Sequence, residues 1–480
     1  MKNTTENQER LAARILRAAY RAWVNGSELR SSRTRNKNFT YGRQWNDYTT
    51  DIDGNPITEY RKLKESGKDP ITNNMMRQMV KNIVGHFRNN LKSAAASPVP
   101  ADTISHNCLD ELDSRNLEEF LISGCCIQRV DRDAFNAHRI RVDNVNLNRF
   151  FVNAIQDTRS WDCEIVGQIH DLNLAELITL TGAAHNRNRA AWIRDLYCNE
   201  NTENAIIDFT ARIGANNESG TGFWHAREGK FRAIEVWTLE CHEIIKCHDS
   251  LNAIYYTAPI DDLEAINDEN RKREGNGVAG ISTQWAIEQA WVCRWFSPMG
   301  NLLAEYPSPF AHGSHPYVMK FYPLTDGEVH SFVEDVIDQQ KHVNRLVTLI
   351  DHIMGASAKG VLLFPDNGLP EGFTWEDIKR IWGATNGIIP YTPSHSGDIP
   401  KQISTNATDI GAFEMIQLQM KLFEDISGIN GVLQGKLPSS AIGSETYKQQ
   451  ISNATIALAD IFDTFNAFRH ERDNKILSIE

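Results

Sequence analysis

Long apolar runs are absent from this sequence of 480 residues. A helix that spans a bilayer needs about 20 consecutive apolar residues, and no stretch approaches that length. The segment Met1–Arg10 is polar and charged and precedes an amphipathic run at Leu11–Val24, whereas a secretory signal needs a continuous apolar core there. We therefore expect no membrane association and no export signal.

Cysteine is sparse, and its spacing does not suggest disulfides. The 8 cysteines are spread through the whole chain, which in the absence of an export signal is typical of free thiols. The pairs Cys241-His242 and Cys247-His248 hold four soft ligands close together. Adjacent residues on a strand point to opposite faces, so one strand could not direct all four at one ion. We expect no metal site here.

Motifs for catalysis are also missing. Three Gly-Lys pairs, at Gly67-Lys68, Gly229-Lys230 and Gly435-Lys436, lack the following Ser or Thr that a phosphate-binding loop needs. Gly275–Gly280 fits the dinucleotide spacing GxGxxG, but the pattern predicts a charged helix or linker before it and a strand after it, whereas the fingerprint needs a strand before and a helix after. No GxSxG motif occurs. The sequence therefore predicts a protein that is not an enzyme and has no cofactor.

Positive charge is in deficit. With 50 Lys and Arg against 62 Asp and Glu, the net charge is -12. This balance argues against a protein that grips nucleic acid through a broad basic surface. It is compatible with a conduit that surrounds DNA, because an acidic lining repels phosphates and discourages sticking.

The first two thirds of the chain mix helices and strands, which indicates an α+β fold. We expect helices at Leu11–Val24 and after Pro70, with a basic, Ser-rich loop at Arg30–Lys37. Asn173 and Glu176 have the spacing of a capping box at a helix start. Two hairpins are expected. One pairs Ala233–Glu240 with Glu243–Thr257, and the other covers Trp285–Tyr306 with a turn at Ser297–Asn301.

The last third changes pattern. A long amphipathic helix is predicted at Ser331–Met354, ending at Gly355, and a second at Asp409–Ile426, ending at Gly428. Between them the sequence predicts a small α/β insert, with strands at Val361–Phe364 and Gly387–Tyr391 around a helix capped by Thr374. A polar loop, Ile429–Gly443, then leads to a third helix capped by Ser444.

An ordered set of short motifs runs through the chain. The motifs are Tyr41–Trp45, Ile71–Asn74, Tyr322–Glu328, Asp338–Gln340 with Asn344, Ala358–Leu362, Asp425–Gly431 and Ser440–Thr446. No single motif is diagnostic, but in order and spacing the set resembles the portal proteins of tailed bacteriophages, especially those of short-tailed phages with Bacteroides-type hosts.

The resemblance implies a division of the chain into the parts of a portal. These are a wing at 1–330, a first stem helix at 331–355, a clip at 356–406, a second stem helix at 407–427, a tunnel loop at 428–443, and a tunnel helix returning toward the wing or crown at 444–480. Nothing after Glu480 supplies a helical crown, so we expect the crown to be absent or truncated.

The same resemblance suggests roles for particular residues. The DNA-facing positions of the tunnel loop would be Gln434, Lys436, Ser439 and Ser440, although an ordinary exposed loop explains them as well. Stem packing would involve Val336, Val343, Val347, Ile350, Phe413, Ile416, Met420 and Phe423, a pattern that any pair of core helices would also give. Trp375 and Trp382 in the clip would either dock the packaging motor or pack the core of the insert.

A portal implies a ring, usually a dodecamer, at the capsid vertex of the virion, assembled in the host cytoplasm. Double-stranded DNA would pass through its channel non-specifically during packaging and ejection, and its protein partners would be the large terminase, the major capsid protein and the head-tail adaptor. The net charge and the lysine-poor loop predict an acidic channel. Two alternatives stay open at this point. They are a capsid or adaptor protein without a tunnel, and a packaging ATPase, which would need the missing phosphate-binding loop.

Overall fold

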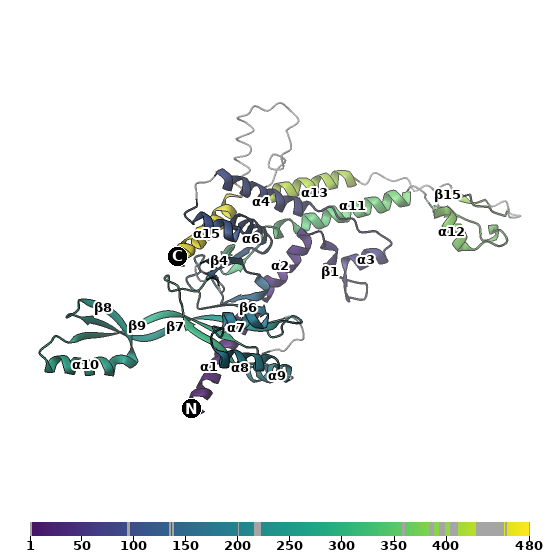
Figure 1. Cartoon of the computed structure of the whole chain (residues 1–480). Coiled ribbons are helices and arrows are strands. Elements are labelled where there is room, and N and C mark those ends of the chain that lie inside the picture. The colour runs from purple at the N-terminus through teal and green to yellow at the C-terminus, as the bar shows by residue number, and fades with distance from the viewer. Residues whose placement is uncertain are drawn as a thin grey trace, which may run out of the picture. The chain divides into compact units, whose positions relative to one another are not determined.

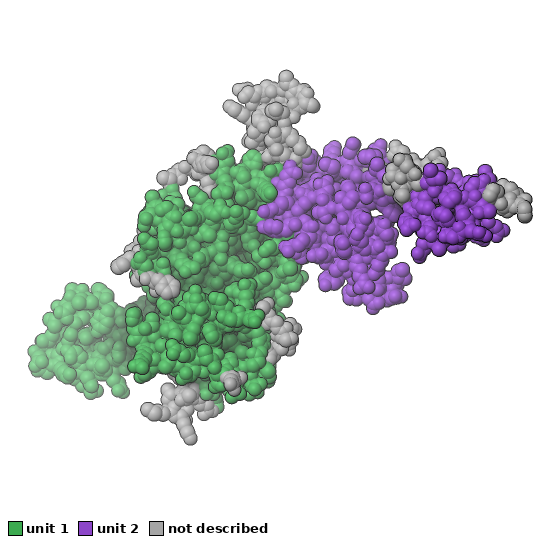
Figure 2. Space-filling view, turned by 45° about the vertical axis from the view of Figure 1, so that its right-hand side comes forward, with its two compact units in different colours: residues 1–37, 80–334, 442–480 green, residues 38–79, 335–441 purple. Residues whose placement is uncertain are grey.

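The computed structural model describes residues 2–93, 97–133, 136, 139–199, 201–215, 222–357, 361–383, 388–392, 399–403, 411–428, 456 and 458–479. The chain forms two compact units, coloured separately in Figure 2. Unit 1 comprises residues 1–37, 80–334 and 442–480, and unit 2 comprises residues 38–79 and 335–441. Helices and antiparallel sheets occur together, which confirms the α+β class.

The largest sheet of unit 1 is antiparallel and has the strand order β10-β9-β7-β6-β5, with β8 also pairing with β7. Its strands are β5 (Phe150–Val152), β6 (Ile165–Leu172), β7 (Phe231–Asp249), β8 (Ile254–Pro259), β9 (Ile281–Phe296) and β10 (Leu302–Pro307). The turn between β9 and β10 requires glycine at position 300. Gly300 has a φ of +85°, and a Cβ there would lie 2.2 Å from the ring of Phe209.

The paired strands β7 and β9 are unusually long, and their distal halves form an arm with β8 and helix α10 (Leu263–Gly275) (Figure 1). The arm has a small core of its own, in which Ile266 of α10 packs with Ile245 and Cys247 of β7. Cys241 and Cys247 both lie on β7, which is one continuous strand rather than the predicted hairpin. Gly275–Gly280 connects the end of α10 to β9, so the preceding segment is a helix rather than a linker, and the predicted strand follows.

Helices cover the large sheet. They are α1 (Lys2–Asn25), α7 (Leu174–Leu180), α8 (Arg187–Tyr197) and α9 (Thr202–Ile213). Ile15, Leu16 and Ala19 on one face of α1 are buried against Phe151 of β5 and Phe209 of α9. Each fully buried aliphatic or aromatic side chain of this kind contributes about 1.5–3 kcal/mol.

A second sheet, with the order β11-β3-β4, completes unit 1. Its strands are β3 (Cys125–Arg132), β4 (Ile140–Asn144) and β11 (Tyr317–Phe321), and a short hairpin, β12 (Pro323–Thr325) with β13 (Glu328–Val329), follows. The helices beside it are α5 (Ala101–Asn107), α6 (Leu109–Ser123) and α15 (Ala459–Ile479). Buried Asp113 of α6 binds Arg469 at 2.8 Å and also pairs with buried Arg472, which fastens α15 to α6.

Unit 2 is built around two long helices, α11 (Ile337–Ser357) and α13 (Ala412–Ser427). Its other elements are β1 (Tyr48–Thr50), β2 (Pro56–Thr58), α3 (Glu59–Glu65), β14 (Val361–Leu363), α12 (Trp375–Gly383) and β15 (Lys401–Ile403). Helices α2 (Ser27–Thr40) and α4 (Met75–Ser93) each contribute residues to both units. None of the described helices is long and apolar enough to cross a membrane.

Several predicted elements differ from those observed. Arg30–Lys37 belongs to helix α2 and is not a loop. Glu243–Thr257 does not form the hairpin partner of the preceding strand, because β7 continues to Asp249 and turns back only at β8. The first long helix begins at Ile337, after a short turn of 3-10 helix, and continues past Gly355. The partner of β14 is β15, not Gly387–Tyr391.

Other predictions from local signals are confirmed. Asn173 and Glu176 form the capping box of α7, with Glu176 N–H donating to the Asn173 side chain at 2.8 Å. The β9–β10 hairpin turns at the predicted residues. Helix α13 ends at Gly428, whose φ of 65° is left-handed.

Candidate functional site

Unit 2 joins three of the short motifs through helix α11. Gln340, Asn344 and Thr348 lie one turn apart on this helix, and all three side chains are buried. Asn344 Oδ1 accepts a hydrogen bond from Asn73 N–H at 2.9 Å, and Thr348 Oγ1 accepts one from Ile71 N–H at 3.1 Å. One face of α11 therefore holds the extended segment that precedes α4.

Gln340 has a second function at the start of α4. Its Oε1 accepts hydrogen bonds from the N–H groups of Met75 and Met76 at 2.9 and 3.2 Å, and its Nε2 donates to the Asn73 carbonyl at 2.6 Å. The first N–H groups of a helix have no partner within the helix, so a buried helix start needs such acceptors. Gln340 thus satisfies the N-terminus of α4 from another helix.

The Gln-Trp motif joins the same arrangement. Trp45 Nε1 donates to Thr72 Oγ1 at 2.9 Å. Asn74 caps α4, since its Oδ1 accepts from Arg77 N–H at 3.0 Å, and its Nδ2 donates to the Thr40 carbonyl at 2.9 Å. The three motifs, distant in sequence, therefore form one hydrogen-bonded cluster within unit 2.

Two cations of α11 add ion pairs to this cluster. Arg345 binds Glu59 at 2.7 Å, and Lys341 lies 3.6 Å from Glu59 and also pairs with Asp47. Lys341 and Glu59 are largely shielded from solvent, which reduces screening by salt. These contacts hold residues 47–59 on α11 in addition to the hydrogen bonds.

Helices α11 and α13 contact each other and lie side by side (Figure 1). Of the positions predicted for stem packing on the α11 side, Val336 and Val343 are buried, and Val347 and Ile350 are half-buried. Val336 lies just before α11 rather than in it. On α13, Phe423 is buried and Ile416 is half-buried. Phe413 and Met420 are 65% and 39% exposed in the single chain.

Helix α13 exposes more apolar side chains than the predicted stripe contains. Besides Phe413 and Met420, Met415 is 48% exposed, Leu418 is 50% exposed and Ile426 is 44% exposed. A helix that is apolar on more than one face normally has more than one face covered. The sequence carried this signal as a second set of apolar residues between the predicted ones, which the single-stripe interpretation missed.

The insert between α11 and α13 is a small α/β module. Strand β14 pairs with β15 in antiparallel register, with Leu362 opposite Gln402. Thr374 caps α12 as predicted, because its Oγ1 accepts from Asp377 N–H at 3.2 Å. The hydrogen bonds from the Thr374 hydroxyl and backbone N–H lower the pKa of the Asp377 carboxyl.

The two tryptophans of α12 differ in environment. Trp375 is 45% exposed and meets the ring of Phe364 edge-on at 5.9 Å, whereas Trp382 is half-buried. The predicted tunnel-loop positions, Gln434, Lys436, Ser439 and Ser440, lie outside the described residues.

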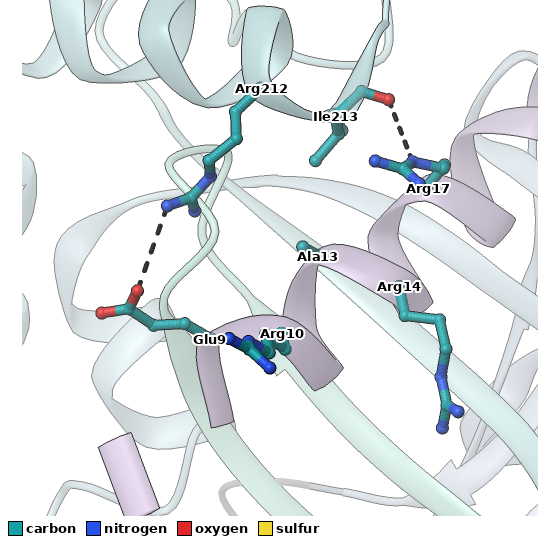
Figure 3. Close-up of a pocket in the computed structure, with 7 residues that line it drawn as sticks. All are labelled: Glu9, Arg10, Ala13, Arg14, Arg17, Arg212 and Ile213. Carbon is teal, nitrogen blue, oxygen red and sulfur yellow. Dashed lines mark hydrogen bonds and ion pairs between the residues drawn. The ribbon is translucent and has the colours of Figure 1, made fainter. Parts of the chain in front are cut away.

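Positive charge gathers in a groove of unit 1 between α1 and α9 (Figure 3). Arg10, Arg14 and Arg17 line its α1 side, where Arg17 Nε donates to the Ile213 carbonyl at 3.0 Å. Across the groove Arg212 lies 4.0 Å from Glu9. These exposed arginines occupy the polar face of an amphipathic helix, where solvation explains them. Among the described residues no group of three or more His, Cys, Asp and Glu side chains could hold a metal ion.

Comparison with known families decides what this arrangement belongs to. The family described as "Phage P22-like portal protein" matches residues 16–479. The chain belongs to the phage P22-like portal protein family. The resemblance seen in the short motifs is thereby confirmed. No curated protein matches the chain.

A portal protein forms the channel through which a phage packages its DNA, and it connects the head to the tail. Portal proteins are structural components without enzymatic activity, and they work as oligomeric rings that interact with capsid, terminase and DNA. The place of this portal protein is the portal vertex of the virion. Family membership therefore decides against the two alternatives, which were a capsid or adaptor protein without a tunnel and a packaging ATPase.

Proposed function

We propose that α11 and α13 form the stem that surrounds the DNA channel, in a ring of twelve subunits. The observation that carries this proposal is that these two helices pack against each other, although the small β14–α12–β15 module separates them in sequence. Each residue of a helix adds about 1.5 Å to its length, so both helices are extended rods. Many copies of such a pair of rods can stand side by side around an axis. Residues 1–330 would then form the wing and 356–406 the clip.

The exposed apolar side chains of α13 support a contact with the neighbouring subunit. Phe413, Met415 and Leu418 are each about half exposed or more in the single chain. Head-to-tail interfaces form a ring when the rotation between neighbouring subunits adds up to a full turn. Each such interface joins one face of a subunit to a different face of its neighbour. We assign the uncovered side of α13 to this interface and the predicted positions Val336, Val343, Val347, Ile350, Ile416 and Phe423 to packing within the stem.

The clip would bind the large terminase during packaging and the head-tail adaptor afterward. Exposed Trp375 is the residue best suited to such a contact, because tryptophan is enriched at binding hot spots. Half-buried Trp382 would support it from within the module. The wing would contact the major capsid protein at the vertex. The ring would be assembled in the host cytoplasm.

Residues 428–443 would be the tunnel loop, with Gln434, Lys436, Ser439 and Ser440 toward the DNA. A single lysine among neutral polar residues would make weak phosphate contacts that carry no sequence information, so a duplex could slide past. The net charge of -12 favours an acidic channel in the assembled ring.

Electron microscopy of the purified chain tests the proposal. We expect closed rings with a central hole and twelve subunits, with α11 and α13 beside the hole. Sheets, shells or solid particles would reject the ring, and a broadly basic channel surface would reject the acidic lining. A terminase-binding assay with Trp375→Ala tests the clip, with Trp192→Ala as control, because Trp192 is a similarly exposed tryptophan, at 41%, in unit 1.

A further inference from the structure

A second cluster of positive charge lies within unit 1 in a more enclosed setting than the groove of Figure 3. A cavity of about 210 Å³ is lined by the end of α1, the start of α2, the segment before β5, strand β6 and the start of β7. Its charged lining consists of four arginines and one carboxylate: Arg30, Arg149, Arg227, Arg232 and Asp171.

The single carboxylate is already fully engaged. Buried Asp171 receives a two-pronged contact from Arg232, at 2.8 and 3.1 Å, and a third contact from Arg149 at 2.8 Å. Two guanidinium groups thus share one counter-charge. Four guanidinium groups and one carboxylate leave an excess of three positive charges around the cavity.

Arg30 and Arg227 pair with no carboxylate among the described residues. Arg30 instead stacks over the ring of Trp23, with its guanidinium carbon 4.0 Å from the ring centroid. Burial lowers the pKa of Arg30 to about 10. Burial also lowers the pKa of Arg149, and the nearby charges of Arg227 and Arg232 lower it further against the pull of Asp171.

Arg232 is buried, Arg30 and Arg149 are half-buried, and Arg227 is exposed at the edge of the cavity. Buried or half-buried cations that repel one another are unfavourable unless an anion compensates them. Guanidinium groups bind phosphate in two-pronged fashion, and several can bind one phosphate at once because it presents at least three accepting oxygens. A carboxylate offers only two oxygens and one negative charge. The excess of charge and the number of donors therefore fit phosphate better.

We propose that this cavity binds a phosphate group, through Arg30, Arg149, Arg227 and Arg232, with Asp171 positioning two of these arginines. The phosphate is supplied by a small anion or by the DNA backbone. The site is distinct from the proposed stem, clip and tunnel loop, since its residues all belong to unit 1.

Thermal unfolding and calorimetric titration of the full chain with inorganic phosphate, against chloride at equal ionic strength, test the proposal. We expect phosphate to raise the unfolding temperature of the wild type in a saturable way. Arg30→Gln and Arg227→Gln should each weaken phosphate binding about tenfold or more, as expected for loss of a charge-assisted contact. Arg14→Gln, in the exposed groove of Figure 3, should leave binding unchanged.

The variants also control for folding. Arg30 and Arg227 have no carboxylate partner to lose, so in chloride both variants should unfold no earlier than the wild type. A purely structural role would lower stability in chloride and phosphate alike. The proposal is overturned if the wild type shows no saturable response to any phosphate source, or if both variants respond as strongly as the wild type does.

A parallel titration with a short DNA duplex identifies the source of the phosphate. Stabilisation by inorganic phosphate alone assigns the site to a small anion, whereas stabilisation by the duplex alone, abolished by Arg30→Gln, assigns it to the DNA backbone. Both results support a phosphate site. Tighter binding of polyglutamate than of either phosphate source would instead make the cavity a dock for an acidic protein segment and would overturn the proposal.

Discussion

Gln340 and Asn73 are joined by a hydrogen bond of 2.6 Å from the side-chain amide of Gln340 to the Asn73 carbonyl, although 267 residues separate them in sequence. The same side chain accepts the first N–H groups of α4. Gln340 therefore connects the N-terminal motif of unit 2 with the helix that we assign to the stem.

Gln340→Ala should destabilise this connection. The change leaves the buried N–H group of Met76 without its acceptor and that of Met75 with only the Asn73 carbonyl at 3.1 Å, which costs about 1–3 kcal/mol. Hydrogen exchange should become faster at these two amides, and the unfolding transition that includes unit 2 should shift to lower urea. Gln417→Ala, at an exposed glutamine of α13, should change neither measurement. Unchanged exchange at Met75 and Met76 in the Gln340 variant would contradict the role assigned to its side chain.

Asp113→Asn should loosen the C-terminal helix. Asp113 is 1% exposed and pairs with both Arg469 and Arg472, so the variant removes the carboxylate partner of Arg469 and leaves Arg472 with only Asp473. Breaking a buried ion pair by removing one partner costs about 3–5 kcal/mol. We expect limited proteolysis to cleave α15 earlier than in the wild type. Asp102→Asn, at an exposed position of α5, is the control, and equal cleavage rates would count against this attachment.

The stability of unit 1 should fall in mild acid. Burial lowers the pKa of His170 and His315 below the ordinary value of 6.5, and it lowers the pKa of His312 to about 4, with the nearby Lys475 charge acting in the same direction on His312 and His315. The unfolded chain therefore binds more protons than the folded chain below pH 6.5. The stability that the fold gains by keeping these histidines neutral is fully present above pH 6.5. It is lost as the pH falls toward their lowered pKa values.

Urea unfolding at about pH 7.5 and about pH 5 measures this effect. His315 Nδ1 accepts a hydrogen bond from Tyr317 N–H at 3.2 Å, and Asn can supply an oxygen in its place without titrating. His315→Asn should therefore reduce the loss of stability between the two pH values. A wild type that is equally stable at both would show that these histidines are free to ionise in the fold.

Leu418→Asp should prevent assembly without unfolding the subunit. Leu418 is 50% exposed in the single chain, so a charge there costs little until a neighbour covers it. Burial of an unpaired carboxylate at an interface is strongly unfavourable. Sedimentation should show rings for the wild type and for Gln417→Asp, an exposed polar position of the same helix, and subunits for Leu418→Asp. Rings of the Leu418 variant would remove this side of α13 from the interface.

Local signals in the sequence predicted local structure well. The capping box at Asn173 and the stop at Gly428 depend on side chains within one turn of the helix end, and both are present. Helix α2 was missed because its basic, Ser-rich sequence has no clear apolar stripe. Distant contacts hold it instead, with Arg33 binding Glu119 at 2.8 Å and Asn36 donating to Ser331 at 2.9 Å.

Non-local pairing explains most of the remaining differences. The full length of β7 depends on β9, which pairs with it from Ile234 to Asp249, so the pattern of β7 alone could not reveal where it ends. Strand β15 begins 38 positions after the end of β14, and the nearer apolar run has the composition of a strand without pairing with β14. The motifs around Asn73 and Gln340 were identified, but their direct contact is a tertiary feature that spacing does not encode.

A density map of the assembled particle tests the central claim most directly. The account predicts a closed ring with α11 and α13 of every subunit beside the central hole and residues 428–443 turned toward its axis. A ring whose hole is bordered by the β7–β9 arm, with α11 and α13 at the outer edge, would contradict it.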